Sequence, residues 1–553
     1  MKILLAIQTL SIPGSAALPE AASTVSTVLL AAMVAALFVL LPLPARAGGE
    51  KPADGAARPP AVAGQFYPDD PLALEGAVKA YLADALPQRS ERPIALVLPH
   101  AGYIFSGQIA ADGWRQAAGR GYDLIVILGT NHTVPSFNGV ALYTGAGFQT
   151  PLGVAAIDHK LAADLMTADA AVVSDPAPHA KEHSVEVQVP FAQVLFPGAK
   201  ILPGIVGRSD PDLCARFGRA LAAATKGRKV LIVASSDLSH YPPYEDAIAA
   251  DRETLTAMAG LDPAGLQSAI RGEMQKGRRG LATCACGEAP AMAAMEAARA
   301  LGATRGIVVS YANSGDTALA DRARCVGYGA VVLTADGKGR DIEALKRPAV
   351  TPQSAPVSET DKKAILAFAR ETIRRYLTTR TAPLARSLPP VFNRSQGAFV
   401  TLTKKGELRG CIGHIPGDMP AGQIVGEMAL RAAFDDPRFP PLEMKELADV
   451  DIEVSLLSPT SRIEGPKAIV IGRDGVVIHK DGRSAVFLPE VALEQGWSRD
   501  DLMDHICRKA GLDSSCWRSG CDLDVFQSLI IREKPEPPKA PAAPGAPEPP
   551  QAH

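Results

Sequence analysis

Short, almost uninterrupted apolar runs alternate with helix-like segments through the first half of the chain. The runs cover residues 93–99, 124–129, 200–206, 230–234 and 306–310, and helix-like patterns cover 211–225 and 287–300. Strands that read as continuous apolar runs are covered on both faces, as in a parallel sheet between layers of helices. The alternation therefore predicts an α/β sandwich with a mostly parallel sheet, whose ligands bind beyond the carboxyl ends of the strands.

An apolar stretch without charges occupies residues 28–43, and the small-x-small triplet Ala45-Arg46-Ala47 follows it. This order is typical of a signal peptide, and the stretch is short for a membrane span. We therefore expect residues 1–47 to be a signal peptide or membrane anchor, and the protein to be exported. The alternative is a retained apolar tail on a cytoplasmic protein.

Segments with little periodicity divide the rest of the chain. Residues 337–358 are rich in proline and polar side chains, which indicates a linker, and residues 535–553 form a proline- and alanine-rich stretch with too few apolar side chains to pack. The sequence thus predicts one domain over residues 59–336, a second over 359–534 and a disordered tail. A length of 553 residues fits two domains of unequal size.

The overall composition is that of an ordinary globular protein. Hydrophobic residues make up 47%, charged residues 21%, and the net charge is −2. With no basic excess to attract phosphates, we expect no nucleic acid partner.

Histidines follow three of the predicted strands. His100, His132 and His240 come directly after the first, second and fourth apolar runs, while EHSVE (182–186) and CACG (284–287) add His183 and Cys286. Parallel strands deliver such residues to one edge of the sheet. Imidazole and thiolate are the preferred ligands of iron, copper and zinc, so this edge is predicted to hold a metal.

Six ordered blocks resemble the Memo family, the protein B component of the AmmeMemoRadiSam set. They are PHAGYIFSGQIAA (99–111), ILGTNHTVP (127–135), EHSVEVQVPF (182–191), SSDLSHY (235–241), CGEAP (286–290) and YANSGD (311–316). The resemblance implies a fold shared with the class III extradiol dioxygenases and a mononuclear metal held by His100, His132 and Cys286. Iron is the metal we expect first, and copper is the second candidate.

The same resemblance places His183, Asp237 and His240 in the pocket around the metal. With ordinary pKa values near 6.5, the two histidines can shuttle protons. Asp237 is either an orienting partner or base, or a cap that follows a strand. If Cys286 is not the third ligand, a carboxylate such as Asp237 or Glu182 takes that place.

A second set of blocks resembles the AMMECR family, the protein A component of the same set. They are LRGCIG (408–413), AAFDDPRFPPL (432–442), DIEVSLLSP (451–459) and VFLPEVALEQGW (486–497). The resemblance implies a smaller α+β domain. Cys411 is either a nucleophilic or redox thiol activated by Arg409, or a packed residue in a tight turn. In an exported protein, two of Cys507, Cys516 and Cys521 are expected to form a disulfide.

Two classes of function agree with these motifs. The first is an iron- or copper-dependent, dioxygenase-like oxidoreductase that acts on a small molecule or a modified peptide of unknown identity. The second is a metal-binding or redox module without turnover, in which the second domain binds a partner. The family names also associate both domains with a radical S-adenosylmethionine enzyme, which is therefore an expected partner.

Overall fold

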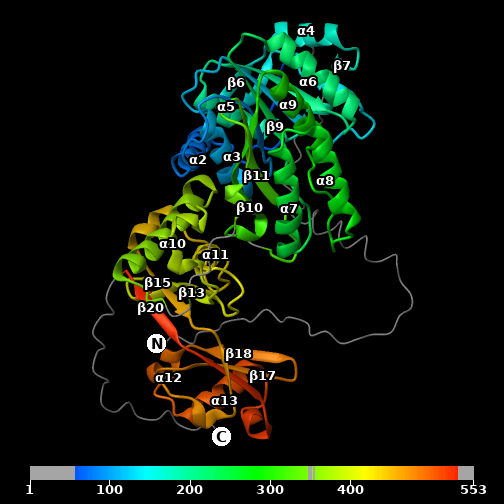
Figure 1. The fold of residues 1–553 in the computed structure, drawn as a ribbon. Coiled ribbons are helices and arrows are strands. Elements are labelled where there is room, and N and C mark those ends of the chain that lie inside the picture. Colours follow the sequence, from blue (N-terminus) through cyan, green and yellow to red (C-terminus); the bar gives the residue numbers. More distant parts are fainter. Residues whose placement is uncertain (1–55, 320, 347–351, 353–354, 534–553) are drawn as a thin grey trace. The chain divides into compact units, whose positions relative to one another are not determined.

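The computed structural model describes residues 56–319, 321–346, 352 and 355–533 (Figure 1). The predicted leader (1–47) and the tail (535–553) lie outside this range. The chain divides into two compact units, whose described parts are residues 56–459 with 528–533 and residues 460–527. Among the described residues, no helix combines the length and the apolar character needed to cross a membrane.

A nine-stranded sheet forms the centre of the first predicted domain, in the order β12-β10-β11-β2-β9-β3-β8-β4-β7. Its strands are β2 (Pro93–Leu98), β3 (Leu124–Thr130), β4 (Val140–Leu142), β7 (Val172–Ser174), β8 (Lys200–Val206), β9 (Val230–Ser235), β10 (Arg305–Asn313), β11 (Gly327–Thr334) and β12 (Gly339–Asp341). Strands β2, β9, β3 and β8 run parallel, while β11 is antiparallel to both of its neighbours. Every residue of β3 and β9 is buried, as strands covered on both faces require.

Helices cover this sheet in two groups. They are α2 (Pro71–Ala83), α3 (Tyr103–Ala117), α4 (His159–Ala168), α5 (Val189–Leu195), α6 (Pro211–Thr225), α7 (Tyr244–Met258), α8 (Pro263–Gln275) and α9 (Glu288–Ala300). Helix α3 packs on β2, β10 and β11 and touches α2, whereas α9 packs on β2, β3 and β9 and touches α6 and α8. The predicted α/β sandwich is therefore confirmed. A separate small sheet has the strand order β1-β5-β6, built from β1 (Ala57–Arg58), β5 (Gly147–Thr150) and β6 (Gly153–Ala156).

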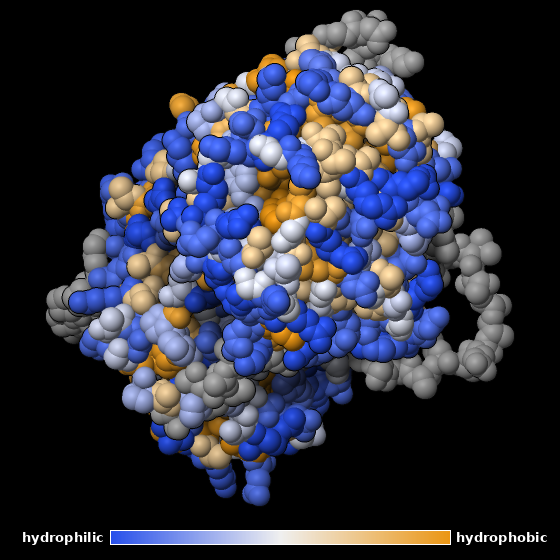
Figure 2. All heavy atoms as spheres, turned by 45° about the horizontal axis from the view of Figure 1, so that its top comes forward, coloured by the Kyte–Doolittle hydropathy of each residue, from blue (hydrophilic) through white to orange (hydrophobic). Residues whose placement is uncertain are grey.

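Helix starts follow from local sequence. Asp70 and Asp210 precede prolines at the first positions of α2 and α6, and each aspartate side chain accepts a backbone N–H of the first turn. Such caps satisfy groups that the helix itself cannot pair, and proline fits there because its missing N–H is not needed. On the surface, the face drawn in Figure 2 is mostly hydrophilic, and its apolar residues occur in small groups.

The second predicted domain contributes to both units. Its first part has the sheet β14-β13-β15-β20, built from β13 (Ala398–Lys404), β14 (Glu407–His414), β15 (Val450–Leu457) and β20 (Ser528–Arg532), with helices α10 (Glu359–Thr379) and α11 (Ala421–Phe434). One face of this sheet is apolar, with Val400, Leu402 and Val454 in the core that α10 and α11 share. The expected smaller α+β domain is thus observed.

The unit of residues 460–527 has its own four-stranded sheet, β16-β19-β17-β18. Its elements are β16 (Ser461–Ile463), β17 (Gly475–Lys480), β18 (Arg483–Phe487), β19 (Asp522–Phe526), α12 (Pro489–Gln495) and α13 (Arg499–Lys509). A disulfide joins Cys507 to Cys516, with Cα atoms 6.0 Å apart, and Cys521 is free. The pair expected among three cysteines is therefore Cys507 and Cys516.

Short 3-10 turns complete the described chain. They are η1 (Ala177–His179), η2 (Glu186–Gln188), η3 (Ser314–Asp316), η4 (Glu343–Leu345), η5 (Ala385–Ser387), η6 (Pro390–Asn393), η7 (Met444–Asp449), η8 (Pro466–Ala468) and η9 (Cys516–Ser519). Within the predicted linker, β12 pairs with β10 and η4 follows it, so the described beginning of that segment belongs to the first domain's sheet.

Candidate metal centre

The three predicted metal ligands lie together at the carboxyl edge of the large sheet. His100 follows β2, His132 follows β3, and Cys286 precedes α9. Their ligand atoms all lie within 4.8 Å of one another, and His100 Nε2 is 3.1 Å from Cys286 Sγ. Strands β2 and β3 run parallel on either side of β9, so their carboxyl ends bring the histidines together, as the sequence predicted. Two imidazoles and one thiol are a donor set that suits iron, copper or zinc.

Glycine allows Cys286 to reach this position. A Cβ atom on Gly287 would meet the Ser235 carbonyl oxygen at 2.3 Å and the Ser236 Cβ at 2.5 Å. The backbone N–H of Cys286 in turn donates to the Asp237 carbonyl over 3.3 Å. The loop that carries the thiol is therefore pressed against the end of β9, next to His100.

A buried chain of side chains orients His100. Its Nδ1 lies 3.1 Å from Ser235 Oγ, which also accepts an N–H of Gln188 over 3.0 Å. Trp114 Nε1 donates to the Gln188 side-chain oxygen. Burial, with the neighbouring histidines His183 and His132, lowers the pKa of His100 well below its usual value. The neutral imidazole, with Nε2 turned to Cys286, is the form that binds a metal.

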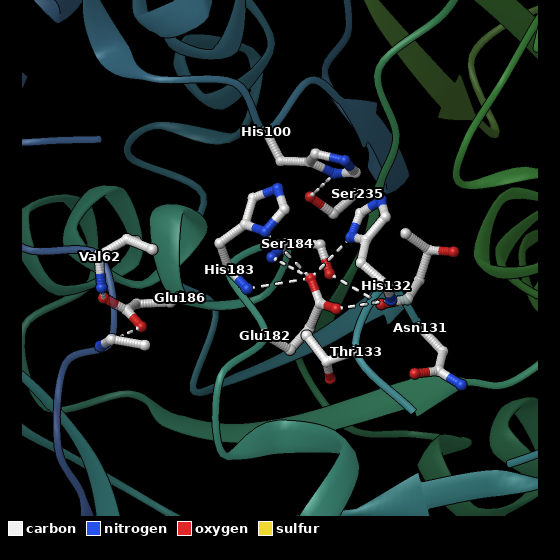
Figure 3. Close-up of polar contacts among 12 residues, drawn as sticks. Val62, His100, Asn131, His132, Thr133, Glu182, His183, Ser184, Glu186 and Ser235 are labelled. Atoms are coloured by element: carbon white, nitrogen blue, oxygen red, sulfur yellow. Dashed lines mark hydrogen bonds and ion pairs between the residues drawn. The ribbon is translucent and has the colours of Figure 1, made fainter. Parts of the chain in front are cut away.

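Glu182 holds His132, as Figure 3 shows. Its Oε1 accepts His132 Nδ1 over 2.9 Å and its Oε2 accepts the His132 backbone N–H over 2.8 Å. The same carboxylate accepts the N–H groups of His183 and Ser184, each over 2.9 Å. Because Nδ1 is taken by a carboxylate, Nε2 is the nitrogen left for a metal.

Glu182 is ionised in these surroundings. Only 1% of it is exposed, and burial by itself raises its pKa, but the hydrogen bond and charge of His132, the charge of His183 and the Ser184 N–H together lower the pKa to about 2. The sequence suggested Glu182 only as a substitute third ligand and missed this orienting role. The signal available was an acidic residue directly before His183 in EHSVE.

A second group of donor atoms overlaps the first. His132, Glu182 and His183 also have ligand atoms within 4.8 Å of one another, and the rings of His132 and His183 stack with centroids 4.8 Å apart. The Glu182 carboxylate already accepts four N–H groups, which leaves it poorly placed as a ligand. The geometry therefore favours His100, His132 and Cys286, with His183 beside them.

Asp237 supports the backbone of a ligand. Its Oδ1 accepts the N–H of His100 over 2.7 Å and that of Ala101 over 3.3 Å. Burial raises the pKa of the carboxyl, although His240 and the bond from the His100 backbone oppose that rise. These are the contacts of a cap that fixes the position of His100. A proton-transfer role for Asp237 stays a prediction.

His240 lies in a loop that a buried acid holds in place. Its Nδ1 is 3.0 Å from the Leu238 carbonyl, which can only accept a hydrogen bond, so the described part of the chain engages Nδ1 and leaves Nε2 without a hydrogen bond. Asp251, on α7, accepts the N–H of Ser239 over 2.8 Å and the hydroxyl of Tyr311 over 2.9 Å. A Cβ on Gly327 would meet Asp251 Oδ2 at 2.0 Å, so only glycine allows β11 to approach.

We expect Asp251→Asn to flatten the pH dependence of stability. Burial raises the pKa of Asp251 from 3.8 to about 7, against the bonds from Ser239 and Tyr311. Between these values the folded state keeps a proton that the unfolded chain has released, so this carboxyl makes stability fall as pH rises. Asparagine has no proton to release.

Melting temperatures of the two proteins at about pH 5 and about pH 8 measure the effect. The melting temperature of the variant minus that of the wild type should increase with pH. A difference that is constant, or that decreases, contradicts the assignment of a raised pKa to Asp251.

Cys411 is the predicted site residue of the second domain. It is 3% exposed on β14, its Sγ lies 3.2 Å from Thr401 Oγ1, and its backbone N–H donates to Asp436. Burial raises the pKa of the thiol, although the Thr401 bond and the charge of Arg438 oppose it. These surroundings favour the packed cysteine, and the nucleophile stays a prediction.

Comparison with known proteins agrees with both resemblances. The sequence model of the Memo-like protein family matches residues 58–332, and that of AMMECR1 matches residues 366–531. A MEMO1 family protein of Methanopyrus kandleri is 35% identical over 288 residues, which cover 50% of this chain and 98% of that protein. Another from Aquifex aeolicus is 37% identical over 273 residues, which cover 49% and 97%.

Among solved structures, an uncharacterized protein from Pyrococcus horikoshii is 33% identical over 32% of this chain and 94% of its own, with a TM-score of 0.31. Membership of a family follows from the sequence matches and not from this structural similarity. The chain belongs to the MEMO1 family, and an AMMECR1 domain follows its Memo domain.

Proposed function

We propose that this protein is a metal-dependent oxidoreductase with one iron ion, or else copper, held by His100, His132 and Cys286. The main support is that one donor atom from each of these three residues lies within 4.8 Å of the other two, while 33% of the His132 side chain remains exposed. A three-ligand site with an open side can admit a substrate, whereas a structural site is closed by four ligands. We take the substrate to be a small organic molecule or a modified peptide.

Bound iron would supply the dioxygen and one-electron chemistry that side chains lack. The residues of the chain position that chemistry and move protons around it. His183 is largely buried, which lowers its pKa to about 4 despite the charge of Glu182. Its Nδ1 is 3.4 Å from Glu182, so Nε2 is the nitrogen that can accept a substrate proton. Nε2 of His240 has the same role on its side of the pocket.

Oxygen uptake tests this function. Iron-loaded protein is expected to consume dioxygen with at least one member of a panel of catechols. His183→Gln and His240→Gln should slow that consumption about a hundredfold or more while leaving the metal bound, because general acid–base catalysis contributes effects of that size. His159→Gln, at an exposed histidine on α4, is the matched control and should react like the wild type.

The alternative function is a metal-binding module whose AMMECR1 domain binds a partner. Stoichiometric metal, with no dioxygen uptake above that of the Cys286→Ala variant across the whole panel of catechols, would favour it.

We also propose, as expectations that both functions share, that the protein is exported and that it is associated with a radical S-adenosylmethionine enzyme. Mass spectrometry of the native N-terminus tests export, because cleavage after Ala47 leaves Gly48 first.

A further inference from the structure

Two segments that are distant in sequence bracket His240. The His240 N–H donates to the Thr283 carbonyl, and the Ala282 N–H donates to the His240 carbonyl, both over 3.0 Å. On the other side, the Tyr241 N–H donates to the Cys325 carbonyl over 2.6 Å. The backbone of Tyr241 has a φ of 74°, which is costly for a bulky residue and is held by these bonds. The pocket wall at His240 is therefore built from residues 280–283, 240–244 and 322–326.

Both flanking segments carry arginines, and we call Arg279, Arg322 and Arg324 the arginine rim. Among the described residues, none of these three guanidinium groups forms an ion pair. By contrast, the adjacent Arg278 pairs with both Asp246 and Glu273. Arg324, which lies against the Tyr241 ring, thus brings a positive charge without a paired carboxylate to the His240 loop, and Arg279 and Arg322 lie in or next to the segments that flank that loop.

Tyrosine rings hold two of these arginines in place. Arg322 Cζ lies 3.3 Å from the centre of the Tyr244 ring, and Arg324 Cζ lies 4.0 Å from the centre of the Tyr241 ring. A guanidinium stacked on an aromatic face keeps its N–H edges available for hydrogen bonds in the plane of the group. Arg322 has a buried guanidinium nitrogen with no partner, although Asp316 lies close enough to feel its charge.

The rim is close to the proposed reaction site. The Tyr241 and His240 ring centres are 5.5 Å apart, and Arg324 Cζ is 4.0 Å from the Tyr241 ring centre. The distance from Arg324 Cζ to the centre of the His240 ring therefore cannot exceed the sum of these two distances. Tyr241 is 41% exposed, and Arg279 and Arg324 are also exposed. A molecule the size of a substituted benzene ring can therefore span from the rim to His240.

We propose that the arginine rim binds the anionic group, a carboxylate or a phosphate, of the molecule that reacts at the metal centre. This inference rests on the proposed function, and it adds the chemical class of the substrate. Arginine matches the planar or tetrahedral oxygens of such groups with paired N–H donors. The positive charge of the rim, offset in part at Arg322 by Asp316, also attracts anions within a Debye length of about 8 Å at physiological salt.

Equilibrium binding tests the rim without requiring turnover. Isothermal titration of the full chain with phenol, benzoate and phenyl phosphate compares one ring with no charge, a carboxylate and a phosphate. We expect one or both anions to bind at least about tenfold more tightly than phenol, because a hydrogen bond to a charged group is worth about that factor. A preference between benzoate and phenyl phosphate tells which anion the substrate carries.

Substitutions in the rim localise the effect. Arg324→Gln and the double variant Arg279→Gln/Arg322→Gln should each weaken anion binding about tenfold or more and leave phenol unchanged. Arg324→Lys should lose less than Arg324→Gln, since it keeps the charge but not the paired donors. Arg299→Gln removes one exposed positive charge at the end of α9 and should bind the anions as the wild type does.

Two results would overturn the proposal: phenol that binds as tightly as both anions, or rim variants with wild-type anion affinity. The outcome is separable from that of the proposed function. If anion binding depends on the rim but no catechol supports oxygen uptake, the rim stands and the oxidoreductase does not. If uptake occurs and rim variants bind anions normally, the oxidoreductase stands and the rim is wrong.

Discussion

Cys286→Ala is expected to reduce bound metal from about one ion per chain to a small fraction of that value. The site has three protein ligands, so loss of the thiolate leaves only His100 and His132 in the set. Of the other donors nearby, Asp237 uses Oδ1 to accept the His100 N–H, and His183 directs its Nδ1 toward Glu182. Metal analysis after equilibration and gel filtration gives the ratio.

Cys284→Ala is the matched control for this variant. Cys284 lies two residues away and is fully buried, so its replacement removes a thiol without touching the proposed ligand set. It should keep full metal content, with at most a modest loss of stability. If Cys286→Ala also keeps its metal, the third ligand is a carboxylate such as Asp237 or Glu182 and the thiolate assignment is wrong.

Glu182→Gln is expected to weaken metal binding by about ten- to a hundredfold, the usual cost of losing the partner that orients a histidine ligand. Glutamine has the shape of glutamate but no charge. Its NH₂ group cannot accept hydrogen bonds, so it leaves unpaired some of the backbone N–H groups that the carboxylate accepts in the wild type. His132 then loses both its fixed orientation and the carboxylate that strengthens Nε2 as a donor. Competition with a chelator of known affinity measures the change.

Glu186→Gln separates this effect from a loss of fold. Glu186 is as buried as Glu182 and belongs to the same EHSVE block, but it pairs with Arg58 and accepts the hydroxyl of Tyr67. Its replacement disrupts a buried ion pair and should cost stability of about 3–5 kcal/mol, while the folded fraction binds metal normally. Equal losses of metal affinity in the two variants would argue against a specific role for Glu182.

The sequence predicted the sheet and the ligand edge because both are local features. Continuous apolar runs mark β2, β3, β8, β9 and β10, and the two proposed ligand histidines follow directly after β2 and β3. Strand β11, which separates β2 from β10, was missed, because its first three residues, Gly327 to Gly329, interrupt the apolar pattern. Those glycines are needed because Asp251 and Leu255 lie against them, and that contact is not visible in the sequence.

The orienting contacts could not be predicted for a related reason. Glu182 and His132 are 50 residues apart, and Arg58 and Glu186 are 128 apart, so only the folded chain shows which acid serves which partner. Cys411 illustrates the opposite case. Its motif suggested reactivity, whereas its burial beside Thr401 favours packing, and spacing alone does not distinguish the two.

X-ray absorption at the edge of the bound metal tests the central claim most directly. In zinc- or iron-loaded protein we predict one sulfur at about 2.3 Å and two imidazole nitrogens at about 2.0–2.1 Å, using the distances known for zinc. The sulfur shell should disappear in whatever metal Cys286→Ala retains. A wild-type spectrum with nitrogen and oxygen neighbours only, and no sulfur, would contradict a site made by His100, His132 and Cys286.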